Sequence, residues 1–272
     1  MRRQILFCRT LAVFIHKMKK TIVLVIATAI KFSAFAQVQT VMINGANIEY
    51  KLWGSGNITV VFESGMGEGM DNWGFIPERV SKFARVLCYN RPGIHGAPAS
   101  RELATVPVMA DRLDRLIQYV CGREDSVILV AHSMGGYIAR YEANKHSRNI
   151  MALVLIDPSA EEAYMNMSQK EMERYVQKGD STYALRPLAE RQEWAHYLTN
   201  YEFMRGINTP KKIQVYIYSS SELNFYKYQH KLLNKNPWSQ HFLVEGNHWF
   251  HLQQPKLIVD LLDQLVERLR MK

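Results

Sequence analysis

The stretch VILVAHSMGGYIARY, residues 127–141, runs an apolar segment directly into a serine that is followed by Met134 and two glycines. A short continuous apolar run of this kind is typical of a strand buried on both faces. The segment from Met134 to His146 has the pattern of a helix. Ser133 therefore stands at a strand-to-helix turn, where it is either the N-cap of the helix or a nucleophile raised on a sharp bend.

Small residues flank this serine at the two positions where a nucleophile on such a turn needs them. Gly135 follows Ser133 by two positions and Ala131 precedes it by two. The backbone is strained at this kind of turn, and the helix must pack closely on the sheet, so bulky neighbours do not fit. The same geometry aims the first backbone N–H groups of the helix, including that of Met134, at the atom that Ser133 attacks.

The rest of the chain alternates short apolar runs with helical patterns, which predicts a mainly parallel sheet covered by helices on both faces. The interval of about 158–210 holds no comparable run, and it is too long for a plain loop. It predicts a helical cap over one end of the sheet, forming an apolar lid. The expected strands are 40–44, 47–54, 58–64, 85–90, 126–132, 151–157, 212–220 and 240–246, and the expected helices outside the cap are 72–84, 108–120, 134–146 and 257–269. The aromatic and methionine residues expected in the lid are Tyr164, Met165, Met167, Tyr175, Trp194 and Tyr197.

Ligands bind at the carboxyl ends of the strands in open α/β sheets, so a base and an acid for Ser133 are sought there. His248 follows the last strand in a Gly-Asn turn and suits a general base near neutral pH. Asp157 and Glu222 each follow a strand that lies between the serine and this histidine. Either carboxylate could hold the imidazole in its working tautomer. His132 adjoins Ser133 on a tight turn and is not expected to face its hydroxyl.

A glycine-rich bend, Gly65-Met66-Gly67, follows the early strand 58–64. Such a bend is either a flexible turn or a loop that points a backbone N–H inward. In the second case Met66 supplies a second donor for an oxyanion, beside Met134.

Four motifs together resemble the α/β-hydrolase-fold serine hydrolases, over essentially all of residues 40–270. AHSMGG resembles the nucleophile elbow, VVFESGMGEG the oxyanion loop, YNRPGIHG the loop after the fourth strand, and EGNHWFHLQQP the segment of the catalytic histidine. The resemblance implies an eight-stranded, mostly parallel sheet and the roles of nucleophile for Ser133 and base for His248. It favours Glu222 as the acid, with Asp157 as the alternative that some members use.

A serine at the elbow sets this chain apart from members that dehalogenate or open epoxides, which use an aspartate there. The resemblance thus implies hydrolysis of a small-molecule ester, or of a thioester, amide or lactone, with neither cofactor nor metal. No Cys/His spacing suggests a metal site. Two alternatives remain open: a ligand-binding protein on the same scaffold, and a cofactor-free lyase or oxygenase that would still use His248.

The net charge of +9 comes mostly from residues 1–36, which carry seven positive charges and no acid and leave 9 − 7 = +2 for the rest. This distribution argues against nucleic-acid binding. The leader predicts a cleaved export signal, with Met18 as an alternative start. A membrane anchor is the competing interpretation, but Lys31 interrupts the apolar run before the roughly 20 residues that a spanning helix needs. Residues 37–272 are thus expected to act in the periplasm or outside the cell, without a stable membrane anchor.

Two cysteines, Cys88 and Cys121, remain beyond the leader, and each lies in an apolar context. Export would permit a disulfide between them. Two buried free thiols are the preferred expectation.

Overall fold

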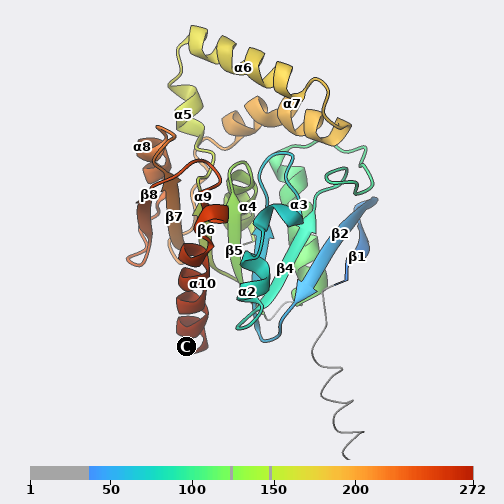
Figure 1. Ribbon diagram of the computed structural model, residues 1–272, viewed down its shortest axis with the longest axis vertical. Helices are drawn as coiled ribbons and strands as arrows, with labels where there is room; N and C mark the ends of the chain where they lie inside the picture. Colours follow the sequence, from blue (N-terminus) through green and yellow to red (C-terminus); the bar gives the residue numbers. More distant parts are fainter. Residues whose placement is uncertain (1–36, 123–124, 147–148, 272) are drawn as a thin grey trace, which may run out of the picture. The chain divides into compact units, whose positions relative to one another are not determined.

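A computed structural model describes residues 37–122, 125–146 and 149–271; the predicted export signal lies outside them. Eight strands form one sheet in the order β1-β2-β4-β3-β5-β6-β7-β8 (Figure 1). β2 pairs antiparallel with β1 and β4, and every other neighbouring pair is parallel. The predicted mostly parallel eight-stranded sheet is confirmed. The strands are β1 Gln39–Ile43, β2 Ala46–Trp53, β3 Ile58–Glu63, β4 Arg85–Asn90, β5 Ser126–His132, β6 Ile150–Ile156, β7 Gln214–Ser220 and β8 Gln240–Val244.

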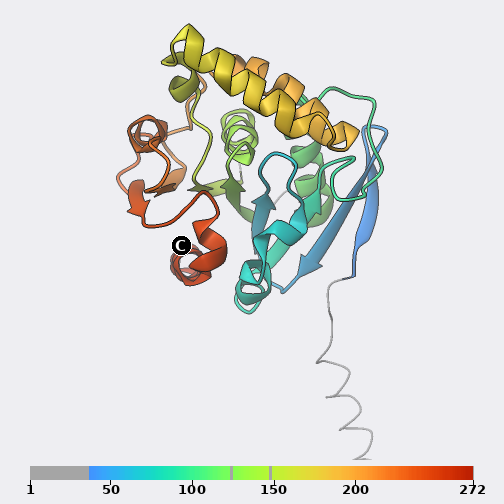
Figure 2. The ribbon, with the colours of Figure 1, turned by 45° about the horizontal axis from the view of Figure 1, so that its top comes forward.

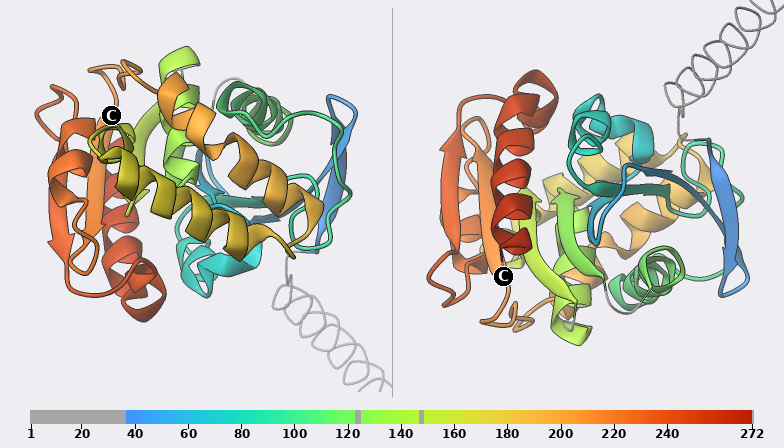
Figure 3. Two further views of the ribbon diagram at one scale, coloured as in Figure 1. Left: turned by 90° about the horizontal axis from the view of Figure 1, so that it is seen from above. Right: turned by 90° about the horizontal axis from the view of Figure 1, so that it is seen from below.

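Helices cover both faces of this sheet (Figure 3). Along β5, Val127, Leu129 and Ala131 join the core on the side of α3 and α4, whereas Ile128 and Val130 join the core on the side of α2 and α10. Since successive side chains of a strand point to opposite faces, a strand buried on both faces needs an unbroken apolar run. These helices are α2 Ile76–Val80, α3 Val106–Cys121, α4 Gly135–Lys145 and α10 Pro255–Arg270.

Three helices occupy the interval between β6 and β7: α5 Glu161–Met165, α6 Gln169–Tyr183 and α7 Leu188–Phe203. The two longer ones, α6 and α7, lie across the carboxyl ends of the central strands (Figures 1 and 2). They pack tightly, because a Cβ added at Gly179 of α6 would lie 1.9 Å from the ring of Trp194 of α7. The long helices of this interval thus stand over the edge of the sheet where ligands are expected.

The expected helix over 72–84 is wrong. The chain forms instead a short 3-10 turn, η2 (Met70–Trp73), and then the five-residue α2. Gly74 separates them with φ 55°, in the left-handed region that interrupts a helix. Three further short elements were not expected from the sequence: α8 Tyr226–Gln229, η3 His230–Leu232 and α9 Phe250–Gln253.

Both cysteines of the described chain are buried and free, which confirms the preferred expectation. Within the residues that the structure describes, no helix has the length and apolar character needed to cross a membrane.

Candidate active site

Ser133 occupies a strained turn between β5 and α4. Its φ is 51°, a conformation that few residues other than glycine adopt. The end of β6 and the segment after it hold the turn: the Ser133 N–H donates to Ile156 O at 3.1 Å, and the Ser159 N–H donates to Ser133 O at 3.0 Å. The N-cap position of α4 belongs to Met134, and no side chain caps that helix. The geometry therefore favours a raised side chain over a helix cap.

The two glycines after this turn are required by close packing. A Cβ at Gly135 would lie 2.5 Å from Glu63 O and 2.7 Å from Ser64 O, and a Cβ at Gly136 would lie 2.9 Å from Pro158. Any other residue at position 135 would push α4 away from the loop after β3. The small residue expected there from the sequence thus has a direct steric reason.

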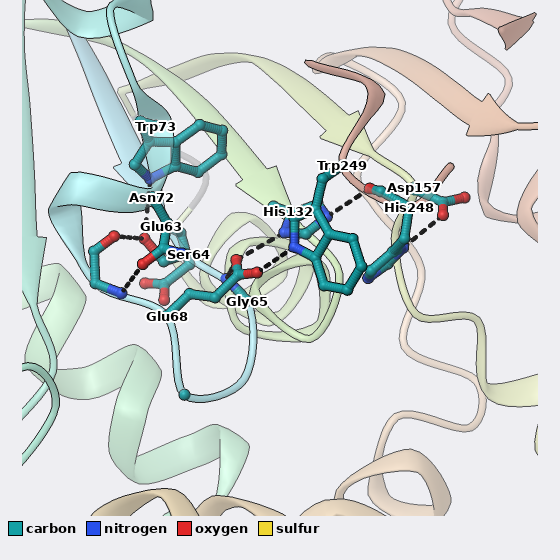
Figure 4. A network of polar contacts seen from close by, with 12 residues as sticks. Glu63, Ser64, Gly65, Glu68, Asn72, Trp73, His132, Asp157, His248 and Trp249 are labelled. Carbon is teal, nitrogen blue, oxygen red and sulfur yellow. Dashed lines mark hydrogen bonds and ion pairs between the residues drawn. The ribbon is translucent and has the colours of Figure 1, made fainter. Parts of the chain in front are cut away.

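His248 is paired with Asp157, which lies directly after β6 (Figure 4). The separation between His248 Nδ1 and Asp157 Oδ2 is 2.6 Å. The other carboxylate oxygen, Oδ1, accepts hydrogen bonds from the Ser220 N–H at 3.1 Å and from Gln229 Nε2 at 2.9 Å. Asp157 is buried, at 2% exposed, so these donors replace the water that it lacks. With an acceptor at Nδ1, the imidazole carries its proton there and leaves Nε2 free.

Among the described residues, Asp157 pairs with His248, whereas Glu222, the acid that the resemblance favours, does not contact it. Glu222 is exposed, and its own backbone N–H donates to Ser220 Oγ at 3.2 Å. The end of β7 serves a different purpose, since the N–H of Ser220 stabilises the Asp157 carboxylate. Asp157 itself has φ 39°, so the chain turns sharply after β6, next to β5, the strand that precedes Ser133.

In the loop after β3, three of the four N–H groups of residues 65–68 donate within the loop or to the cap. The Gly65 N–H donates to Glu68 Oε2 (3.0 Å), the Gly67 N–H to Glu193 Oε2 of α7 (2.7 Å), and the Glu68 N–H to Gly65 O (3.1 Å). Among the described residues, no hydrogen-bond acceptor contacts the N–H of Met66, nor that of Met134. These are the two groups that the sequence predicts as oxyanion donors, and that role stays a prediction.

Arg91, which the sequence analysis missed, holds this loop in place. It is buried, and it donates to Glu63 Oε1 at 2.6 Å, to Ser64 O at 2.8 Å and to Gly65 O at 2.5 Å. Its Nε donates to Glu193 Oε1 at 2.6 Å, which ties the loop to α7. Burial raises the pKa of Glu63, although Arg91 and a hydrogen bond from Tyr89 oppose that shift. The sequence does show an arginine directly after an apolar strand. Its partners Glu63 and Glu193 lie 28 and 102 residues away along the chain, so the sequence does not indicate what it binds.

Ser133, His248 and Asp157 line one cavity of about 420 Å³ under the cap. Four of the expected lid residues line it, whereas Met165 and Met167 do not. The volume suits a small molecule, and aromatic walls favour apolar groups. The aromatic side chains around it are Tyr164, Tyr175, Tyr183, Trp194, Tyr197, Phe225 and Trp249.

Two other features lie outside this site. A cavity of about 510 Å³, lined by residues of α4, α5 and the segments 206–211 and 231–235, includes none of the three residues above. Asp114, Glu142 and His146 have ligand atoms within 4.8 Å of one another, a spacing compatible with a metal ion. Burial raises the pKa of Glu142 to about 7, and its bond to His146 opposes this shift. Neither feature contacts the histidine–aspartate pair.

The sheet, the strained serine turn and the histidine–aspartate pair define the class of protein. Residues 58–259 match the family described as alpha/beta hydrolase fold, and the chain belongs to that family. Membership supports a hydrolase activity, and it accounts for the arrangement of sheet and turn.

Two curated proteins are similar in sequence to part of this chain. It is 28% identical over 106 residues to the uncharacterized protein YqjL of Bacillus subtilis (39% of this chain, 42% of that protein). It is 28% identical over 123 residues to proline iminopeptidase PfmaB of Pestalotiopsis fici, covering 43% of each. The matches thus span less than half the length of these curated relatives.

Solved structures share the fold at low identity. The serine hydrolase CCSP0084 from Cycloclasticus zankles has a TM-score of 0.63 at 15% identity (85% of this chain, 98% of that one). The epoxide hydrolase CorEH has a TM-score of 0.65, also at 15% identity (86% and 99%). At such identities the likeness concerns the fold alone.

Proposed function

We propose that the protein is a serine hydrolase that cleaves a carboxylic ester through Ser133, His248 and Asp157. The observation that carries the proposal is the pairing of His248 with a buried aspartate at a cavity that also receives the strained serine. A free Nε2 is what a general base needs, and a serine hydroxyl becomes a good nucleophile only beside such a base.

Each step follows from these groups. His248 Nε2 takes the proton from Ser133 Oγ as the oxygen attacks the ester carbonyl carbon. The resulting oxyanion accepts hydrogen bonds from the N–H groups of Met66 and Met134. When the tetrahedral intermediate collapses, the bond to the alcohol breaks and Nε2–H protonates the leaving oxygen. Water, deprotonated by Nε2, then attacks the acyl-enzyme, which releases the acid and returns the proton to Oγ.

Asp157 contributes by stabilising the imidazolium that forms transiently on His248. Its two oxygens accept three hydrogen bonds in a buried position, which holds the carboxylate against the imidazole. Because these hydrogen bonds are already in place, the site needs little rearrangement when charge develops on His248. Such preorganised hydrogen-bonding groups are a major source of rate enhancement.

The cavity supports esters with a compact apolar or aromatic acyl group. The hydroxyls of Tyr164, Tyr197 and Ser159 bond one another at 2.6 Å, so these groups meet their hydrogen-bonding needs without the substrate. Amides are a second substrate class to test, since one matched relative is called a proline iminopeptidase.

The test measures the turnover of p-nitrophenyl esters of increasing acyl length and, in parallel, of a prolyl amide. We expect hydrolysis of short and aromatic esters, and none by Ser133→Ala. Absence of turnover for every ester and amide by folded protein would favour the ligand-binding alternative. Retained activity in Ser133→Ala would contradict the proposed nucleophile.

We also propose that residues 1–36 are a cleaved export signal, supported by a basic start, an apolar core and the Ala34-Phe35-Ala36 site. N-terminal sequencing of the protein recovered from the periplasm or medium should then begin at Gln37. Retention of the leader in a membrane fraction would contradict this.

A further inference from the structure

His132, the residue before the nucleophile, is buried with an oxygen atom at each ring nitrogen (Figure 4). Nδ1 lies 2.8 Å from Glu68 Oε2, and Nε2 lies 3.0 Å from the backbone carbonyl oxygen of His248. A carbonyl oxygen only accepts, so Nε2 must carry a proton. A carboxylate also only accepts, so the state of Nδ1 depends on whether Glu68 is ionised.

The surroundings of Glu68 favour its ionised form. Burial alone would raise its pKa, but the hydrogen bond and charge of His132, together with hydrogen bonds from Trp249 and Gly65, lower it to about 2. Oε1 accepts from Trp249 Nε1 at 2.6 Å, and Oε2 accepts from the Gly65 N–H at 3.0 Å. Both oxygens thus accept a hydrogen bond from a donor other than His132, the pattern of an ionised carboxylate, and an ionised Glu68 requires Nδ1 of His132 to donate as well.

The rings around His132 supply no competing charge of their own at neutral pH. Trp73 of η2 lies at 6.5 Å between ring centroids, and His251 of α9 at 4.7 Å. Burial and the neighbouring His132 lower the pKa of His251 to about 3, so it is neutral. The ring of His248 lies at 4.5 Å and is neutral when it acts as a base. Glu68 is the one carboxylate that contacts the His132 ring among the described residues.

We propose that His132 is a doubly protonated positioning residue that fixes both the backbone of His248 and the oxyanion loop, with Glu68 as its counter-ion. The proposal rests on the proposed function, since positioning matters only if His248 is the base. The bond to the carbonyl of His248 places that residue relative to the strand end that carries Ser133. The bond to Glu68 places the loop that presents the Met66 N–H.

The loop after β3 is shaped around this pair. A Cβ at Gly65 would lie 2.6 Å from Glu68 Oε2 and 3.1 Å from His132 Nδ1, so only glycine lets the two side chains meet. Trp249, next to the base, reaches back to the same carboxylate. The loops after β3 and β8 and the last residue of β5 therefore converge on one histidine–carboxylate pair beside the proposed triad.

The first test is nitrogen NMR of the full chain labelled with 15N-histidine, with resonances assigned by comparison with His132→Gln. We expect both ring nitrogens of His132 to carry a proton, because each faces an oxygen acceptor. In Glu68→Gln one nitrogen should lose its proton, whereas Glu78→Gln, which changes an exposed carboxylate on α2, should leave the spectrum unchanged. A bare nitrogen on His132 in the parent protein at pH 7 would overturn the proposal. This readout needs no turnover, so it stands or falls separately from the proposed function.

The second test measures ester kinetics of His132→Phe, which keeps a ring but donates no hydrogen bond. We expect kcat per active site, counted by covalent titration of the serine, to fall about 10- to 100-fold while KM changes less than about twofold. His132→Gln, which can donate to one of the two oxygens, should recover part of the loss. An unchanged kcat per titrated site, even with a lowered Tm, would show a purely structural role and overturn the positioning claim.

Discussion

Two histidine–carboxylate pairs lie side by side in this molecule, and they are built for different purposes. His248 pairs with Asp157 and His132 with Glu68, at 2.6 and 2.8 Å, and the two imidazole rings are 4.5 Å apart. In the first pair, Nε2 of His248, which lines the cavity, has no partner within the part of the chain that the structure describes. In the second pair both nitrogens face acceptors. The free nitrogen, rather than the carboxylate partner, distinguishes a base from a positioning group.

The largest expected effect separates the two histidines. His248→Ala should lower kcat for ester hydrolysis by about 10⁶-fold, because the nucleophile then loses its base. His132→Phe should lower kcat only about 10- to 100-fold. Steady-state kinetics of both variants beside His196→Ala, a histidine outside the cavity, measures the difference. Equal losses in the first two variants would break the comparison.

The next effect separates the carboxylates. Asp157→Asn should lower kcat by about 10⁴-fold, because an amide at this position favours the wrong tautomer of His248. Glu222→Gln is the matched control and should stay within about twofold of the parent, since that side chain is exposed. A large loss in Glu222→Gln with a small one in Asp157→Asn would return the role of acid to Glu222.

A smaller effect on kcat is expected when a side chain that donates a second hydrogen bond to either carboxylate is replaced. Gln229 donates to Asp157 and Trp249 donates to Glu68. Gln229→Met should lower kcat about tenfold, because it weakens the support of the acid. Trp249→Phe should lower it by about threefold or less, since His132 and Gly65 still hold Glu68. The reverse order of the two effects would place the more important pair at Glu68.

The smallest effect is on stability at low pH. The pKa of Glu68 is about 2 in the folded protein and near 4.5 when unfolded, so its contribution is complete above pH 4.5 and is lost as the pH falls toward 2. His251, with a folded pKa of about 3, is also destabilising in acid, since the unfolded chain binds its proton below pH 6.5. Urea unfolding at pH 7, 5 and 3.5 should show a steady decrease in the free energy of unfolding. The decrease below pH 5 should be shallower in Glu68→Gln, and identical slopes in the two proteins would contradict the ion pair.

Most of the sheet could be predicted from the sequence because its strands are continuous apolar runs. The run 151–157 predicts β6 within one residue, for example, and 85–90 matches β4. The break in the expected helix over 72–84 could not be predicted, since the pattern is helical while Gly74 turns the chain out of the helix. The cap sequence predicts helices but not the close fit of Gly179 on Trp194.

The site was predictable where it depends on local turns and unpredictable where it depends on distant contacts. Ser133 and His248 follow strands in recognisable turns. The choice between Asp157 and Glu222 depends on which side chain reaches the imidazole, and two adjacent strand ends offer the same pattern. The pair of His132 with Glu68 joins residues 64 positions apart, and neither position signals its partner.

The most direct test of the central claim is covalent labelling by a fluorophosphonate, which reacts preferentially with a serine activated by a base. Intact-mass and peptide analysis should show one adduct per chain, located on Ser133, and its rate should collapse in both His248→Ala and Asp157→Asn. A folded protein that takes up no label, or labels at another residue, would contradict the claim that Ser133, His248 and Asp157 act together.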